Sequence, residues 1–210
     1  MARNVVHPDY APWSDIPSSV ASDCLDRFAA MSSAIRPLTG MGVVGPAHTL
    51  RTVVGDNASI HRELTSVAAG SVLVIDAGGY DDRAVWGDVL ALAATMRGIL
   101  GVVIDGAVRD VDDMTAAGFP VFARGTSPAG PHKSGGGVSA TRISCGGVPV
   151  NPGDLIVGDS DGVTVVPGDL VDATYQRARA RLELEHTWKE KIRAGIPSSV
   201  VMGLADPDES

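Results

Sequence analysis

Residues 101–110, GVVIDGAVRD, join an apolar run to a pair of opposite charges. The run 101–104 contains only Gly, Val and Ile before Asp105, and such continuous apolar segments are typical of strands covered on both faces. Gly106 then predicts a turn, and Arg109 and Asp110 follow it. The stretch therefore predicts a buried strand whose carboxyl end leads to an arginine and an aspartate at the start of a helix.

The same order of turn, apolar strand and acid recurs at residues 70–76 and 153–159. Residues 85–97 have helical spacing, and the inward face is predicted to consist of Val89, Leu92, Ala93 and Met96. A short helix from Asp110 and a strand at 120–123 complete a βαβαβ run. This alternation is typical of an α/β fold.

The rest of the chain predicts additional elements on both sides of this run. They are helices at 18–31 (with Val20, Cys24, Leu25 and Phe28 on one face) and 57–69, a strand at 41–54, short strands around Ile143, Val148 and 163–166, and a long charged helix from 169 to about 194. We expect three parts: an irregular arm (1–17), one α/β domain (18–168), and a C-terminal helix and tail (169–210). The last part is expected to pack on the domain or on a neighbouring subunit.

The composition excludes several classes of protein. The 17 Lys and Arg residues against 25 Asp and Glu residues give a net charge of −8, which argues against binding nucleic acid through its phosphates. No apolar run reaches membrane-spanning length, and the N-terminus lacks a signal pattern. Cys24 and Cys145 have no metal or redox spacing, so both are expected to be reduced thiols in a cytoplasmic protein.

A glycine motif at residues 40–45, GMGVVG, matches the fingerprint of dinucleotide-binding loops. That function requires a strand before the motif and a helix after it, and neither flank fits. The glycines are instead expected to allow a bend in a strand.

Asp88, Asp105, Arg109 and Asp110 all fall where predicted elements begin or end. In βαβ units, ligands gather beyond the carboxyl ends of the strands, so Asp105, Arg109 and Asp110 are expected on one rim. A carboxylate there can hold Mg²⁺ or Mn²⁺ with several waters, and an arginine can bind a carboxylate or a developing enolate. The helix amides near residues 87–90 can hold an anion, and the whole set suits a small 2-oxo acid.

A purely structural interpretation remains open from these residues alone, because aspartate is favoured in the first turn of a helix and Arg–Asp neighbours are common on surfaces. His48 and His61 lack partners at metal-ligand spacing and are interpreted as packed or capping residues. Asn57 is interpreted first as a helix cap, with a role in the site as the alternative. Lys133 lies in a Gly/Pro-rich loop, and no lysine is well placed for a Schiff base.

Several segments resemble the RraA-like family, which includes class II aldolases of 4-hydroxy-4-methyl-2-oxoglutarate and 4-carboxy-4-hydroxy-2-oxoadipate. They occur in family order: SDCLDR, GDN, AVWGDVLALAA, GVVIDGAVRDVDDM, GFPVFARGT and CGGVPVNPGDLIVGDSDGVTVVP. The aldolases of the family carry an Asp, twenty residues and then Arg-Asp, which Asp88, Arg109 and Asp110 match without a gap. Regulators of ribonuclease E in the same family lack the acid after the arginine.

The resemblance implies a layered β/β/α fold of the swivelling-domain type and a divalent-metal aldolase that releases pyruvate, with oxaloacetate decarboxylation as a side activity. It implies the following roles: Asp110 as the metal ligand, Arg109 and Asp88 as catalytic residues, and the amides of Gly87, Asp88, Val89 and Leu90 as the carboxylate site. It also implies a homotrimer, or a dimer of trimers, in which Glu185 or His186 reaches the neighbour's site. A non-catalytic regulator of ribonuclease E is the alternative function.

Overall fold

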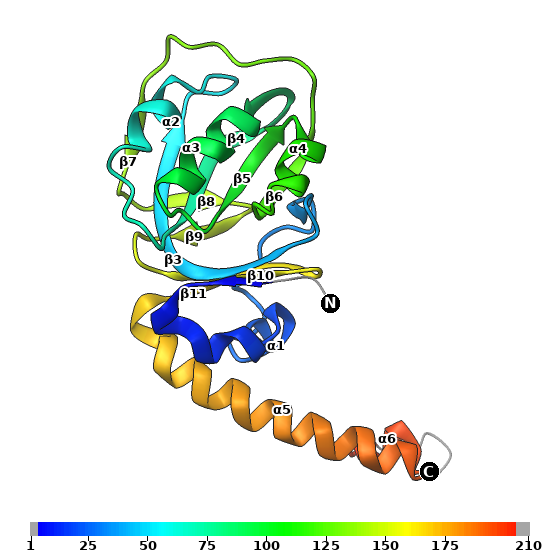
Figure 1. Ribbon diagram of the computed structural model, residues 1–210. Coiled ribbons are helices and arrows are strands. Elements are labelled where there is room, and N and C mark those ends of the chain that lie inside the picture. Colours follow the sequence, from blue (N-terminus) through cyan, green and yellow to red (C-terminus); the bar gives the residue numbers. More distant parts are fainter. Residues whose placement is uncertain (1–3, 205–210) are drawn as a thin grey trace.

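The computed structural model describes residues 4–204 and is built around one mixed sheet (Figure 1). The strand order is β11 (Gly162–Val166), β10 (Leu155–Asp159), β3 (Gly42–Thr52), β4 (Val72–Trp86), β5 (Gly101–Val108), β6 (Val121–Thr126) and β2 (Arg36–Pro37). Two short strands, β1 (Asn4–Val6) and β7 (Gly137–Ser139), also pair with β3. Strands β3 to β6 run parallel to one another, so their carboxyl ends meet at one edge of the sheet.

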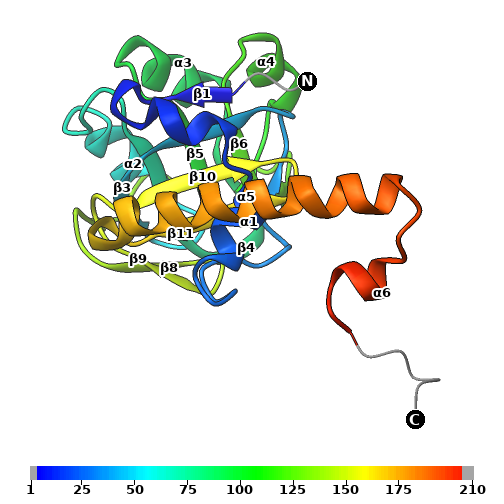
Figure 2. The ribbon, with the colours of Figure 1, turned by 90° about the horizontal axis from the view of Figure 1, so that it is seen from below.

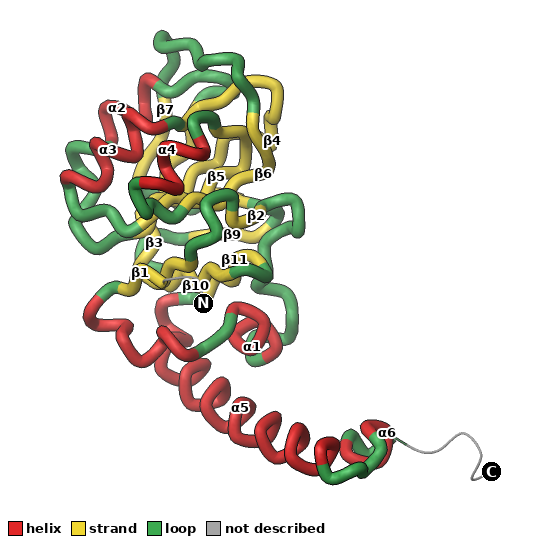
Figure 3. Tube along the Cα trace, turned by 45° about the vertical axis from the view of Figure 1, so that its right-hand side comes forward, coloured by secondary structure: helices red, strands yellow, loops and turns green. Residues whose placement is uncertain are grey.

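Each face of the sheet is covered by a different layer. Helices α2 (Ala58–Glu63), α3 (Asp88–Met96) and α4 (Val111–Ala116) pack on one face over a core that includes Leu73, Ile104 and Trp86. The hairpin of β8 (Ile143–Cys145) and β9 (Val148–Val150) packs on the other face, against Phe122 and its neighbours. Helices, sheet and hairpin form the layered α/β fold that the sequence predicts (Figures 1 and 3).

A third hydrophobic cluster lies below the sheet, where the N-terminal segment packs against the long C-terminal helix. It contains residues of the 3₁₀ segment η1 (Pro8–Asp15), of α1 (Ser18–Asp23) and of the long helix α5 (Val171–Arg193). The short turn η2 (Gly168–Leu170) precedes α5, and α6 (Ser198–Val201) follows it. Figures 1 and 2 show that α5 extends well beyond the body of the molecule. None of the helices described between residues 4 and 204 has the length and apolar composition needed to cross a bilayer.

The prediction of an irregular arm over residues 1–17 is wrong for its described part. Residues 4–6 form β1 beside β3, and Trp13 of η1 is buried in the third cluster. The helix predicted at 18–31 ends at Asp23, because Asp26 and Arg27 take positive φ angles that no helix continues through. Phe28, predicted to face inward, is therefore exposed. The tail beyond residue 204 lies outside the described residues.

The inward face predicted for the helix at 85–97 is also wrong. Val85 and Trp86 end strand β4, so α3 begins only at Asp88 and its buried residues are Leu90, Ala91 and Ala94. Val89, Leu92 and Met96 are exposed at 65%, 64% and 79%. The spacing predicts a helix, but both faces of this one are apolar, so the pattern does not show which is buried.

Two expectations about glycines have different outcomes. Gly42 and Gly45 lie inside β3, where a Cβ on Gly42 would come within 2.2 Å of Asn4 Oδ1 and one on Gly45 within 3.1 Å of the Gly70 carbonyl oxygen. The glycines of the motif at 40–45 therefore allow close packing of strands, and the motif does not form a dinucleotide-binding loop. Gly106 makes no turn, because β5 continues through it to Val108.

Candidate active site

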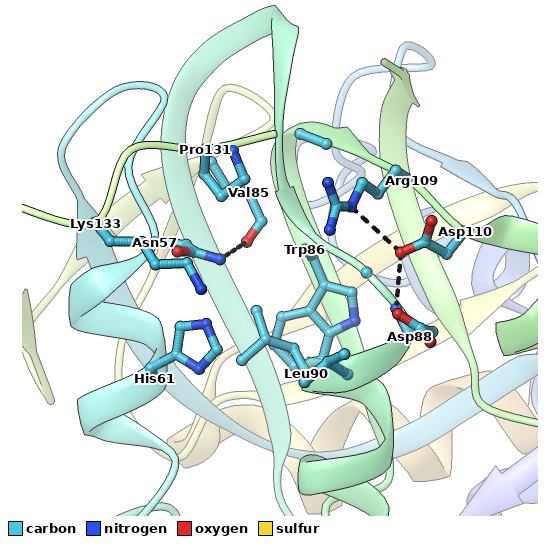
Figure 4. A pocket seen from close by; sticks show the side chains of 13 residues that line it. Asn57, His61, Val85, Trp86, Asp88, Leu90, Arg109, Asp110, Pro131 and Lys133 are labelled. Atoms are coloured by element: carbon cyan, nitrogen blue, oxygen red, sulfur yellow. Dashed lines mark hydrogen bonds and ion pairs between the residues drawn. The ribbon is translucent and has the colours of Figure 1, made fainter. Parts of the chain in front are cut away.

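A cavity of about 110 Å³ opens where β4 and β5 end and α3 begins (Figure 4). It is lined by residues from four parts of the chain: Asn57 and His61; Ala84 to Leu90; Arg109 and Asp110; and Pro131 and Lys133. The backbone holds these parts together, since the Arg109 N–H donates to the Trp86 carbonyl at 3.0 Å. The cavity lies at the parallel-strand edge where the sequence predicts a rim.

Asp110 has a left-handed backbone conformation, with φ 57° and ψ 39°, at the start of α4. Non-glycine residues are uncommon in this conformation and concentrate at functional sites, and aspartate and asparagine tolerate it better than other side chains. One carboxylate oxygen of Asp110, Oδ2, lies 3.3 Å from Nε of Arg109 and 3.4 Å from the backbone nitrogen of Asp88. The conformation thus turns the carboxylate toward the first turn of α3.

Gly87 makes this approach possible. A Cβ at Gly87 would lie 2.5 Å from Asp110 Oδ2 and 3.2 Å from Cγ of Arg109, inside van der Waals contact. The amides of Val89 and Leu90 follow in the first turn of α3, where backbone N–H groups have no intrahelical acceptor. The beginning of α3 therefore offers donors for an anion beside the Asp110 carboxylate.

Arg109 separates this cavity from a second, more open hollow of about 530 Å³. That hollow is lined by Arg109, Asp110, Val111, Asp112, Asp113, Thr126, Ser127 and Pro128. Nε of Arg109 faces Asp110, while Gly130 lies so close that a Cβ there would be 3.0 Å from Nη1. The guanidinium group pairs with Asp110 and remains about half-exposed.

Asn57, His61 and Lys133 lie at the end of the cavity away from Asp110 (Figure 4). The Asn57 side chain does not cap α2; its Nδ2 donates to the Val85 carbonyl at 3.1 Å. Partial burial, reinforced by the nearby Lys133 ammonium, lowers the pKa of His61. Asn57 and His61 are one helical turn apart, and this i, i+4 spacing is the sequence signal that places His61 beside Asn57.

Asp56 performs the capping that the sequence assigns to Asn57, and it also holds the loop that carries Lys133. Its Oδ1 accepts from the Ala58 amide at 2.8 Å, and its Oδ2 accepts from the amides of Ser134 and Gly135 at 2.7 and 2.8 Å. Burial opposes ionisation of Asp56, but these three amides outweigh it and lower its pKa. Asp56 therefore positions Lys133 without lining the cavity itself.

Three residues predicted for the site, Asp105, Glu185 and His186, do not line this cavity. Asp105 is buried elsewhere: its carboxylate pairs with Arg124 and accepts from the Gly146 amide at 2.8 Å. The expectation that Asp105 shares a rim with Arg109 is therefore corrected, because a side chain of β5 three residues before the strand end points into the core beside β6. Glu185 pairs with Arg181 on α5, and His186 pairs with Glu190.

A bound metal at this site would have one protein carboxylate in place and a second nearby. No group of three or more His, Cys, Asp or Glu side chains that could hold a metal occurs among residues 4–204. Zinc sites need three or four such ligands, whereas Mg²⁺ keeps several waters and uses one or two carboxylates. Asp110, with Asp88 adjacent, fits a hydrated Mg²⁺ or Mn²⁺.

Comparison with known proteins places this chain in a family. A sequence model described as "RraA-like: Aldolase/RraA" matches residues 18–165, which include every residue that lines the cavity. The chain belongs to the RraA-like family. Both cysteines of this RraA-like chain are free thiols, as predicted.

Relatives of this RraA-like protein carry more than one functional name. A Halalkalibacterium halodurans protein, provisionally named 4-hydroxy-4-methyl-2-oxoglutarate aldolase, is 46% identical over 79% of this chain and 80% of its own. Among solved structures, an uncharacterized Pseudomonas syringae protein superposes with a TM-score of 0.80 at 29% identity, over 91% of this chain and 94% of its own. The RNA-processing inhibitor RraA from Thermus thermophilis superposes with 0.67 at 31% identity, over 73% and 93%.

Proposed function

We propose that this protein is a divalent-metal class II aldolase that cleaves 4-hydroxy-2-oxo dicarboxylic acids to pyruvate. The observation that carries the proposal is the convergence of the Asp110 carboxylate, the Arg109 guanidinium and the first amides of α3 on one cavity. Binding a 2-oxo acid requires three groups: a carboxylate that holds a cation, a guanidinium group that binds an oxyanion, and backbone amides that bind the acid's carboxylate. The provisional name of the H. halodurans relative supports the same activity.

Asp110 would hold Mg²⁺ or Mn²⁺, with waters as the other ligands and Asp88 ordering them. When bound, such a cation polarises an oxo acid and lowers the energy of charge that develops on its oxygen. These two carboxylates fit the assignment, because proteins usually bind Mg²⁺ through one or two carboxylates and leave its other positions to water. No lysine takes part in this chemistry.

The protein groups divide the remaining tasks. The amides of Val89 and Leu90 bind the carboxylate of the pyruvate half, and Arg109 stabilises the negative charge that develops when the C3–C4 bond breaks. Asp88, exposed at the mouth of the cavity, accepts the proton of the C4 hydroxyl through a water. Oxaloacetate loses carbon dioxide through the same enolate, so its decarboxylation is expected as a side activity.

We infer a homotrimer, or a dimer of trimers, with sites completed by a neighbouring subunit. Val89, Leu92 and Met96 expose an apolar face beside the cavity, and exposed apolar patches of this kind mark protein contacts. The long helix α5, which carries Glu185 and His186, extends beyond the body of its own chain (Figure 2). On this proposal, one of them reaches the site of a neighbour.

Metal-dependent turnover distinguishes the aldolase from the alternative, a non-catalytic regulator of ribonuclease E. The alternative is favoured by the likeness to the T. thermophilis inhibitor. The test is a screen of 4-hydroxy-2-oxo acids and oxaloacetate with Mg²⁺ or Mn²⁺, reading pyruvate release with and without EDTA. The aldolase releases pyruvate faster than a protein-free blank with the same metal and loses this excess with EDTA, whereas a regulator shows no excess over the blank under either condition.

A further inference from the structure

The end of the cavity away from Asp110 carries two basic side chains, His61 and Lys133 (Figure 4). Both residues are exposed to solvent, so a ligand in the cavity can contact them. None of the ion pairs found among residues 4–204 involves Lys133, whereas Arg109, at the other end, is paired with Asp110. Within these residues, the unpaired positive charge of the cavity lining therefore lies at the Lys133 end.

The loop that carries Lys133 is fixed by backbone hydrogen bonds on both sides of this residue. The His132 N–H donates to the Gly55 carbonyl at 2.8 Å, and the amides of the two residues after Lys133 donate to the Asp56 carboxylate at 2.7 and 2.8 Å. Ordering a loop when a ligand binds costs free energy, and a loop that is already fixed avoids most of this cost. An anion that binds Lys133 therefore needs to order only its side chain.

The imidazole of His61 reaches the same end of the cavity from α2. Figure 4 shows the end of the Lys133 side chain beside this imidazole, and the Lys133 charge is near enough to lower the pKa of His61, in addition to the larger effect of partial burial. The neutral imidazole that a lowered pKa favours still has one N–H to donate, and the ammonium group has three. The two side chains can therefore bind the two oxygens of one carboxylate.

The two ends of the cavity suit the two ends of a dicarboxylic acid. The first amides of α3 offer donors at the Asp110 end, and Lys133 lies at the other end. The wall between them includes Val85 and Leu90 (Figure 4). These apolar side chains can contact a carbon chain but do not bind charge, so the charged groups of a ligand are expected at its two ends.

We propose that Lys133 and His61 bind the second carboxylate of the substrate, beyond C4, and thereby select dicarboxylic over monocarboxylic 2-oxo acids. This inference rests on the proposed function and adds the residues that recognise the far end of the acid. A carboxylate that pairs with an ammonium group accepts charge-assisted hydrogen bonds, which are stronger than neutral ones. Neither residue transfers a proton in this assignment, and Asp88 keeps that role.

The test uses two 2-oxo acids of equal length, 2-oxoglutarate and 2-oxopentanoate, which differ only in a carboxylate or a methyl group at C5. Isothermal titration calorimetry with the Mn²⁺-loaded protein measures the binding of each acid without any turnover. The wild-type protein should bind 2-oxoglutarate at least roughly tenfold more tightly than 2-oxopentanoate. Lys133→Met should lower the affinity for 2-oxoglutarate by roughly tenfold or more and change that for 2-oxopentanoate by less than about threefold. Lys133→Arg should retain more of this preference than Lys133→Met, and Lys189→Met on α5 is the control that should retain all of it.

Equal binding of the two acids by the wild-type protein would overturn the inference. An equal loss on both acids in Lys133→Met would also overturn it, because it would place Lys133 at the carboxylate that both acids share. His61→Leu should reduce the preference roughly threefold, the effect of one neutral donor, and an unchanged preference would remove His61 from the subsite.

A second pair of acids, 4-hydroxy-2-oxoglutarate and 4-hydroxy-2-oxopentanoate, tests the subsite during cleavage. Lys133→Met should lower kcat/KM for the first acid by roughly tenfold or more and leave that for the second within about threefold of the wild-type value. A wild-type protein that binds 2-oxoglutarate through Lys133 but cleaves neither hydroxy acid would keep the carboxylate subsite and reject the proposed function. Cleavage of both hydroxy acids with no dependence on Lys133 would do the reverse.

Discussion

The carboxylate of Asp110 accepts the backbone N–H of Asp88 at 3.4 Å, although the two residues begin different helices. The left-handed backbone of Asp110 directs its side chain back across the ends of β4 and β5 to reach that amide. The same geometry places the carboxylate beside the first turn of α3, where unpaired backbone N–H groups carry partial positive charge.

Asp110→Asn should weaken Mn²⁺ binding and leave folding intact. Asparagine tolerates the left-handed conformation, so the free energy of unfolding should change by less than about 1 kcal/mol. Loss of the charged oxygen should lower Mn²⁺ affinity at least roughly tenfold, the loss that even changes to outer partners of metal ligands cause. Titration of Mn²⁺ by electron paramagnetic resonance, with thermal unfolding in parallel, measures both. Wild-type Mn²⁺ affinity in this variant would remove Asp110 as the ligand.

Gly87→Ala should disable the site without unfolding the domain. The new methyl group would meet Asp110 Oδ2 at 2.5 Å, so either the carboxylate or the start of α3 must shift. A displacement of this size costs on the order of 100-fold in kcat/KM when it misplaces reacting groups. Gly136→Ala is the matched control, because a Cβ at Gly136 meets nothing within 4 Å. Equal activity of the two variants would mean that close packing at Gly87 is unimportant.

Much of this arrangement could be predicted from local sequence. The apolar runs and acidic strand ends predict the parallel strands, and the continuous order of β4, α3 and β5 places Asp88, Gly87 and Arg109 at one edge. The pairing of β1 with β3 could not be predicted, because three residues of moderate apolarity carry no pattern of their own. The buried face of α3 could not be predicted either, since the exposed face of the helix is just as apolar.

The errors at the site have a similar origin. Asp105 and Asp110 are both acids at a strand end, yet strand alternation sends Asp105 into the core, where Arg124 lies on β6. The first interpretation of Asn57, as a cap, missed that Asp56 caps α2 and that the Asn57 side chain bonds to Val85 instead. The Arg124–Asp105 and Asn57–Val85 contacts join residues that are 19 and 28 positions apart, and local patterns do not contain such contacts.

Arg124→Met should destabilise the protein and spare the active site. Asp105 is buried, and its partners are the Arg124 guanidinium and the Gly146 amide that begins the β8–β9 turn. Removing Arg124 leaves a buried carboxylate without its counter-charge, which should lower the free energy of unfolding by about 3 kcal/mol. Urea unfolding measures this loss, and Asp105→Asn in the same background should recover part of it. A large change in Mn²⁺ affinity at unchanged stability would instead return Asp105 to the site.

The pKa of His61 should lie below its ordinary value of 6.5 and should rise toward it in Lys133→Met. Partial burial is the larger cause and remains in this variant, so the recovery should be incomplete. Because the folded state binds this proton more weakly than the unfolded chain does, stability from this group is present above pH 6.5 and decreases as the pH falls from there toward the folded-state pKa. Titration of the imidazole C–H resonances by NMR, assigned with His61→Gln, measures the shift, and Lys189→Met on α5 is the control that should not move it. A His61 pKa that does not respond to Lys133→Met would place the Lys133 ammonium too far from the imidazole to affect its charge.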